Sequence, residues 1–147
     1  MSEELVDTLC DLTQIARDGQ VFYEDAAAKA EDAEVRETTL AMAAVRRHLV
    51  EEFSHLLQIR GEEPPASGTL VGSMHKLYTD LRARWSGDRD GVYVSELEEA
   101  EDRLLHTFES ALVDVEADDA RAVLRRYVPL ARAAHERMRN LKRRKGD

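Results

Sequence analysis

Apolar residues recur every three or four positions along four stretches of this chain, each more than about twenty residues long. Such a stripe marks the inward face of an amphipathic helix, because three to four residues complete one helical turn. The stretches run over about residues 3–30, 32–60, 90–116 and 118–144. Helices of this length bury their stripes most readily against one another. The pattern therefore predicts an all-α four-helix bundle.

One connection is much longer than a hairpin requires. It joins the second long stretch to the third, and it contains a loop at Glu62–Gly68 followed by a shorter apolar stripe over about residues 69–85. A helix of about 16 residues rises roughly 24 Å, enough to carry the chain back along most of a bundle. We therefore expect a ferritin-like four-helix bundle with a helical crossover, residues about 69–85, between the second and third long helices. The whole chain, residues 1–147, is expected to form a single domain.

Composition excludes several classes of partner. The formal net charge of −9 disfavours nucleic acid, whose binding depends largely on Lys and Arg. The chain has no apolar run of membrane-spanning length, and its first residues are acidic where a signal peptide would be basic. We expect a cytoplasmic protein that has no membrane partner.

Glu101 is the most informative polar residue, because it lies on an apolar stripe. Leu97, Leu104 and Phe108 share its helical face. A carboxylate at such a position must be paired, protonated or bound to a metal, since an isolated buried charge is too costly. His135, on the inward side of the last stretch, is the first partner that the pattern suggests.

Helix rise predicts which residues share the level of Glu101. With a crossover, Glu101 lies about 12 residues from one end of the bundle and His135 about 9, which separates them by about 5 Å along the axis. The stretches 19–23 and 41–45 reach the same level. The cluster predicted there gathers Glu24, Glu98, Glu101 and His135.

Two interpretations of this cluster remain open at this stage. Carboxylates and an imidazole suit iron, manganese or zinc, so the cluster could hold one metal ion. Alternatively, Glu101 belongs to a buried network in which it pairs with His135 or Arg46 and Tyr23 donates a hydrogen bond.

A second, weaker polar cluster is predicted from Glu52 and His55. Together they form a Glu-x-x-His motif, which ferritin-like di-iron proteins carry on two of their helices. The last stretch has Arg132 where the second such motif would need a glutamate. Moreover, Glu52 and His55 lie more than about 10 Å from the level of Glu101, so the two clusters cannot form one di-iron site.

Several short motifs resemble a bacterial family of ferritin-like four-helix-bundle proteins whose function is unknown. They are Arg17–Gln20, Gly61–Pro64, Ser67–His75, Glu98–Asp102 and Ala134–Glu136. The resemblance covers essentially the whole chain. It implies that the residue at position 20, Glu101 and His135 come together. This chain departs from the family pattern at one of them, since Gln20 stands where a glutamate is usual and an amide is a poorer ligand for a divalent ion.

Two functions follow as expectations. The first is a non-catalytic bundle, a stress-related or scaffold protein that forms a homo-oligomer, most simply a dimer through the apolar side of the crossover helix (Leu77, Leu81 and Trp85). The alternative is a metal-binding oxidase or iron-handling protein, using iron, manganese or zinc at Glu101 and His135. The sequence names no substrate and no catalytic residue.

Overall fold

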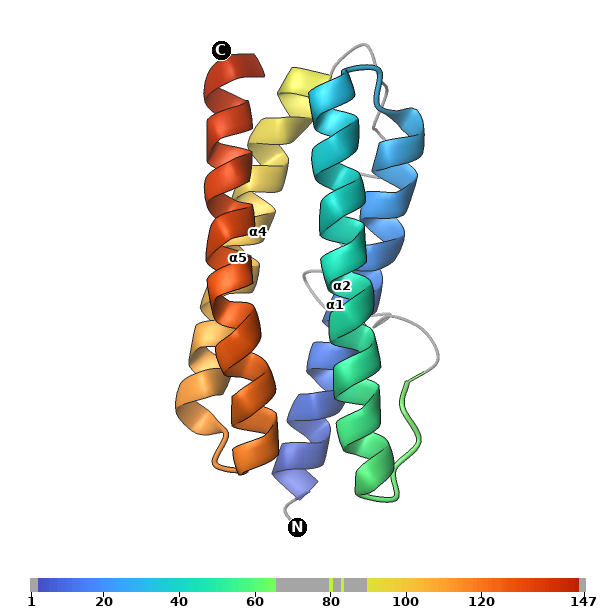
Figure 1. Cartoon of the computed structure of the whole chain (residues 1–147), viewed down its shortest axis with the longest axis vertical. Helices are drawn as coiled ribbons and strands as arrows, with labels where there is room; N and C mark the ends of the chain where they lie inside the picture. The colour runs from blue at the N-terminus through green and yellow to red at the C-terminus, as the bar shows by residue number, and fades with distance from the viewer. Residues whose placement is uncertain (1–2, 66–79, 81–82, 84–89, 146–147) are drawn as a thin grey trace.

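The computed structural model describes residues 3–65, Asp80, Ala83 and residues 90–145. Within these residues the chain forms four long helices: α1 (Glu3–Lys29), α2 (Ala33–Ile59), α4 (Asp90–Asp114) and α5 (Asp118–Lys145) (Figure 1). Each lies within a few residues of its predicted bounds. The predicted crossover helix, about 69–85, lies outside the described residues except for Asp80 and Ala83, which are both helical.

The ends of α2 are set by local chemistry that the sequence carries. Asp32 caps the helix, because its side-chain Oδ1 accepts a hydrogen bond of 3.0 Å from the backbone N–H of Val35. Gly61 ends it with a positive φ of 75°, a conformation that glycine adopts without steric cost. The N–H groups of Gly61 and Glu62 then donate to the carbonyls of Gln58 and Leu57, and the N–H of Arg60 also donates to Leu57, so the last turn of the helix is closed.

The four helices form two antiparallel hairpins, α1–α2 and α4–α5, that pack against each other (Figure 1). Helices α2 and α4 run in the same direction, from the end of the bundle that holds the C-terminus toward the end that holds the N-terminus (Figure 1). The chain between them must therefore return along the length of the bundle. This confirms the predicted parallel relation of the second and third long helices, while the helical form of the connection lies outside the described residues apart from Asp80 and Ala83.

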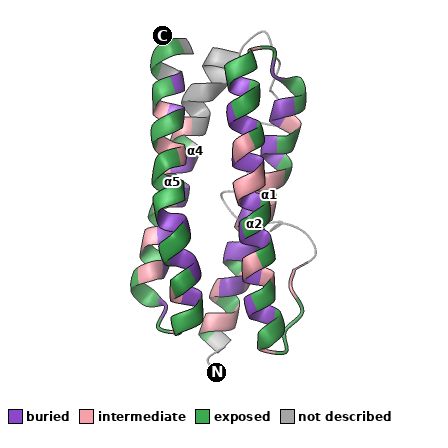
Figure 2. Ribbon diagram, in the orientation of Figure 1, coloured by how far each residue is buried: buried purple, intermediate pink, exposed green. Residues whose placement is uncertain are grey.

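The core lies along the inward faces of all four helices, as the buried positions in Figure 2 show. Phe53 of α2 and Phe108 of α4 meet edge to face across the two hairpins, with their ring centroids 6.4 Å apart. The other large side chains that are fully buried are Leu9, Phe22, Tyr23, Leu49, Leu57, Leu104, Leu124 and Met138. No helix in the described part of the chain is both long and apolar enough to span a membrane.

Three ion pairs join α2 to α5 along the line where the hairpins meet at the surface. Arg60 pairs with Asp119 at 2.7 Å. Arg144 pairs with Glu34 at 2.6 Å, and Arg126 pairs with Glu52. The pairs of Arg126 and Arg144 are largely exposed and contribute little each, about 0–1 kcal/mol, whereas the Arg60 side chain is only 5% exposed. The apolar core and the buried polar groups therefore do most to hold the hairpins together.

Candidate functional site

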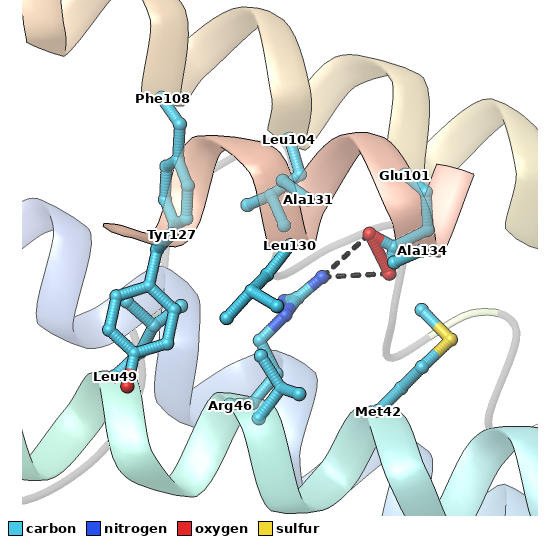
Figure 3. A pocket seen from close by; sticks show the side chains of 11 residues that line it. Met42, Arg46, Leu49, Glu101, Leu104, Phe108, Tyr127, Leu130, Ala131 and Ala134 are labelled. Carbon is cyan, nitrogen blue, oxygen red and sulfur yellow. Dashed lines mark hydrogen bonds and ion pairs between the residues drawn. The ribbon is translucent and has the colours of Figure 1, made fainter. Parts of the chain in front are cut away.

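A buried ion pair joins the two hairpins in the middle of the bundle. Glu101 of α4 has no exposed surface, and Arg46 of α2 is 3% exposed. The Nη2 atom of Arg46 donates to both carboxylate oxygens of Glu101, at 2.7 Å to Oε1 and 2.8 Å to Oε2 (Figure 3). Charge-assisted hydrogen bonds of this length are among the strongest in proteins. Glu101 is thus buried and paired, as predicted, and its partner is Arg46.

Tyr23 of α1 completes the network. Its hydroxyl group donates a hydrogen bond to Oε1 of Glu101. The guanidinium carbon of Arg46 lies 5.5 Å from the centroid of the Tyr23 ring, within range of a cation–π interaction. One tyrosine therefore contacts the anion through its hydroxyl and the cation through its ring, and the network draws on three helices.

Gly19 of α1 makes room for the guanidinium. A Cβ atom built on Gly19 would lie 3.1 Å from the Cζ atom of Arg46 and closer still to Nη1. Glycine within a helix costs about 0.5–1 kcal/mol relative to alanine. The close approach of Arg46 is the physical reason for a glycine at this buried position.

The network resolves the electrostatic problem that Glu101 poses. Removing a carboxylate from water costs several kcal/mol, and only a close counter-charge with good hydrogen bonds offsets that cost. Arg46 supplies the positive charge, and three hydrogen bonds reach the two oxygens. Arg46 therefore fills the electrostatic role that a metal ion would have at this carboxylate.

A small cavity lies beside the pair, between α2, α4 and α5 (Figure 3). Its volume is about 30 Å³, enough for one or two water molecules. Arg46 and Glu101 form its charged side, and the rest is largely apolar. That part of the wall includes Met42, Leu49, Leu104, Phe108, Tyr127 and Ala131.

Of the two partners predicted for Glu101, Arg46 is the one that pairs with it, and His135 contacts other carboxylates instead. Its Nε2 atom lies 3.2 Å from Oε1 of Glu98 and 3.7 Å from Oδ1 of Asp102, on the neighbouring helix α4. Glu98 and Asp102 are one turn apart and face α5, whereas Glu101 faces the centre of the bundle. The long side chain of Arg46 reaches Glu101 there from α2.

The other residues of the predicted upper cluster lie further out. Glu24 is exposed, and its Oε2 accepts a hydrogen bond of 3.4 Å from Nε2 of Gln20, one turn earlier on α1. Within the described residues, no group of three or more His, Cys, Asp or Glu side chains is arranged to hold a metal ion. The predicted set is therefore divided between a buried pair, a histidine–carboxylate contact and an exposed glutamate.

The second predicted cluster also separates. Glu52 forms its ion pair with Arg126 of α5, and His55 is exposed to solvent. Both lie on α2 away from the level of Glu101, as helix rise predicted. Sequence reasoning missed Asp102 as a neighbour of His135, and it gave Gly19 no role beside Arg46. A glycine on an apolar stripe, level with Arg46, was the available signal of a close contact.

Comparison with known proteins places the chain in a family. A family model described as a domain of unknown function, DUF2383, matches residues 4–114. The chain belongs to this family. The matched DUF2383 region contains Gly19, Tyr23, Arg46 and Glu101 and ends before α5, which carries His135. No curated protein and no solved structure matches the chain.

Proposed function

We propose that this protein is a non-catalytic, ferritin-like scaffold bundle whose interior charge is balanced by an arginine. The observation that carries the proposal is the pairing of Arg46 with both oxygens of Glu101. A metal-dependent oxidase needs a carboxylate whose oxygens can coordinate the ion. At Glu101 these oxygens already accept hydrogen bonds from Arg46 and Tyr23.

The topology supports the ferritin-like part of the proposal. Ferritin-like folds consist of two helical hairpins joined by one long crossover, so that the second and third long helices run in the same direction. Helices α2 and α4 have this relation (Figure 1). The bundle is then expected to act through its surface, as a homo-oligomer or as a support for other proteins.

Metal analysis of the purified protein tests the proposal. The protein is incubated with ferrous iron, manganese or zinc, desalted, and assayed for bound metal and for oxidation of ferrous iron. We expect much less than one ion per chain, a melting temperature that added metal does not raise, and no iron oxidation above that of the buffer. Stoichiometric metal that is lost in the Glu101→Gln variant would overturn the proposal.

One contact supports a second candidate, a metal-binding protein with its site at His135. The His135 imidazole and the Glu98 carboxylate lie 3.2 Å apart, close to the separation of two ligands that share one ion at about 2.0–2.2 Å each. In this candidate Glu98 and His135 bind first, and Glu101 or Glu24 would join them only after rearrangement. Metal binding that is abolished by His135→Ala but unchanged by Arg46→Ala would favour it over the scaffold.

A further inference from the structure

Helices α4 and α5 carry opposite charges and lie side by side. Helix α5 has ten Lys and Arg residues against three Asp and Glu, a formal charge of +7. Helix α4 has eight Asp and Glu residues against one Arg, a formal charge of −7. The whole chain carries −9, so α5 differs in sign from the rest of the protein. The hairpin is thus divided lengthwise into a basic and an acidic half.

Ion pairs within the α4–α5 hairpin involve only some of these charged residues. Arg132 pairs with Glu109 at 2.8 Å, and Arg139 lies 3.8 Å from Glu98. Arg125 and Arg143 are exposed and take part in no ion pair within the described residues. They are 18 residues apart, which is five full turns, so they lie on one line along α5.

Acidic groups that remain accessible to solvent lie on the neighbouring helix. Glu99 is exposed and takes part in no ion pair within the described residues. Asp102 keeps 46% of its side chain exposed beside His135. Both belong to the part of α4 that is adjacent to α5. Solvent-accessible cationic and anionic groups therefore occur on the same hairpin.

The outer face also allows another helix to come close. Near these arginines, α5 exposes the small residues Ala122, Pro129 and Ala133. On α4, Val113 is 79% exposed, the highest value among the large apolar residues at the described surface. A face about 37 Å long and two helices wide could bury about 750 Å² on each partner, close to the area of a standard stable interface.

We propose that a second copy of this chain binds the α4–α5 face through a two-fold axis parallel to the bundle. Such an axis places α4 of each copy on α5 of the other, so that the acidic half of the face meets the basic half twice. An axis perpendicular to the helices would instead place α4 on α4 and α5 on α5, where like charges repel. This inference rests on the proposed scaffold function and names the interface of its homo-oligomer.

A two-fold axis parallel to the helices leaves both copies at the same height. It therefore also predicts which residues meet across the interface. Within one chain Glu109 is level with Arg132, and Glu98 is level with Arg139. Glu99 and Asp102 of the second copy would therefore face the part of α5 between Arg132 and Arg139.

Charge reversal on the full chain tests the interface. One variant reverses the basic helix (Arg132→Glu with Arg139→Glu), and the other reverses the acidic helix (Glu99→Arg with Asp102→Arg). Light scattering during size-exclusion chromatography reports the mass of each. We expect the wild type to be a dimer and each variant alone to be a monomer, because both symmetric contacts become repulsive. An equimolar mixture of the two variants should again give a dimer.

Two controls show whether loss of the dimer is specific to the α4–α5 face and whether each variant is folded. Arg126→Glu with Arg137→Glu reverses the same number of charges on another side of α5, and it should leave the dimer intact. Circular dichroism melting shows whether each variant is folded. The wild-type dissociation constant should also rise at least about tenfold between low salt and about 1 M NaCl, because surface charges are screened at high salt.

The results separate this inference from the proposed function. A wild-type dimer that persists in both reversed variants would overturn the α4–α5 interface while leaving a homo-oligomer formed elsewhere, for example through the crossover segment. A wild-type dissociation constant that falls as salt is added would also overturn the α4–α5 interface. High salt strengthens apolar association, whereas it screens attraction between charges. A wild type that stays monomeric at high concentration would overturn both the interface and the homo-oligomer of the scaffold proposal.

Discussion

Replacing Gly19 with alanine should reverse the effect that this change usually has in a helix. In the interior of α1, alanine would ordinarily stabilise by about 0.5–1 kcal/mol, because glycine loses more backbone freedom on folding. At position 19 the new methyl group would overlap Nη1 of Arg46 and lie 3.1 Å from Cζ. The guanidinium cannot move aside freely, since it is bound to both oxygens of Glu101.

The magnitude follows from these two opposing effects. Overpacking of a well-filled interior costs about 1–3 kcal/mol. After the gain in helix propensity, Gly19→Ala should lower the free energy of unfolding by about 1–2 kcal/mol. In a protein that already carries Arg46→Ala, the methyl group meets no guanidinium. The same substitution should then raise the free energy of unfolding by about 0.5–1 kcal/mol.

Urea denaturation of the wild type, the two single variants and the double variant measures the cycle. If Arg46→Ala does not fold, the pair Arg46→Leu with Glu101→Leu provides a background that leaves no unpaired charge. A Gly19→Ala effect of the same sign in both backgrounds would refute the reasoning, because the close contact between Gly19 and Arg46 would then be absent.

Three further predictions concern charged groups and their partners. Arg46→Ala should lower the free energy of unfolding by about 3–5 kcal/mol, whereas replacing Arg46 and Glu101 together with leucine should cost far less in the same urea titration, because no buried charge is left unpaired. Tyr23→Phe should cost about 1.5–3 kcal/mol, the usual contribution of a hydrogen bond to a charged group; a change below half a kcal/mol would show that the hydroxyl does not bind Glu101. The hydrogen bond from Arg60, and secondarily that from the backbone of Ala120, lowers the pKa of Asp119. The ionised Asp119 therefore stabilises the fold above its unfolded pKa of about 3.9, and this stabilisation is lost as the pH falls through the lower folded value. Urea midpoints at neutral and acidic pH should therefore differ less in Asp119→Asn than in the wild type.

The helices could be predicted closely from the sequence because their signals are local. The apolar stripes set the inward faces, Asp32 begins α2, and Gly61 ends it. The length of the chain between α2 and α4 was enough to predict that these two helices run in the same direction. Each of these features depends on residues close together in the chain or on chain length alone.

The candidate site could be predicted only in part, because helix rise gives the level of a residue but not the direction of its side chain. The same count of residues placed Arg46 and His135 within reach of Glu101. The partner was decided by direction, since Glu101 faces the centre of the bundle while Glu98 and Asp102 face His135. The room that Gly19 leaves for the guanidinium favours Arg46 further, and this follows only from three helices considered together.

The buried pair also restricts how the two hairpins can slide past each other. Arg46 and Glu101 are 55 positions apart in the chain and belong to different hairpins. Apolar surfaces built from leucine, alanine and phenylalanine can bury similar areas in several alignments, but a shift of one helical turn, about 5.4 Å, would leave both charges facing hydrocarbon. The pair therefore selects one axial alignment among several of comparable apolar burial. A variant with leucine at both positions should keep much of its stability and lose this uniqueness, which would appear as broadened or doubled NMR signals from the core.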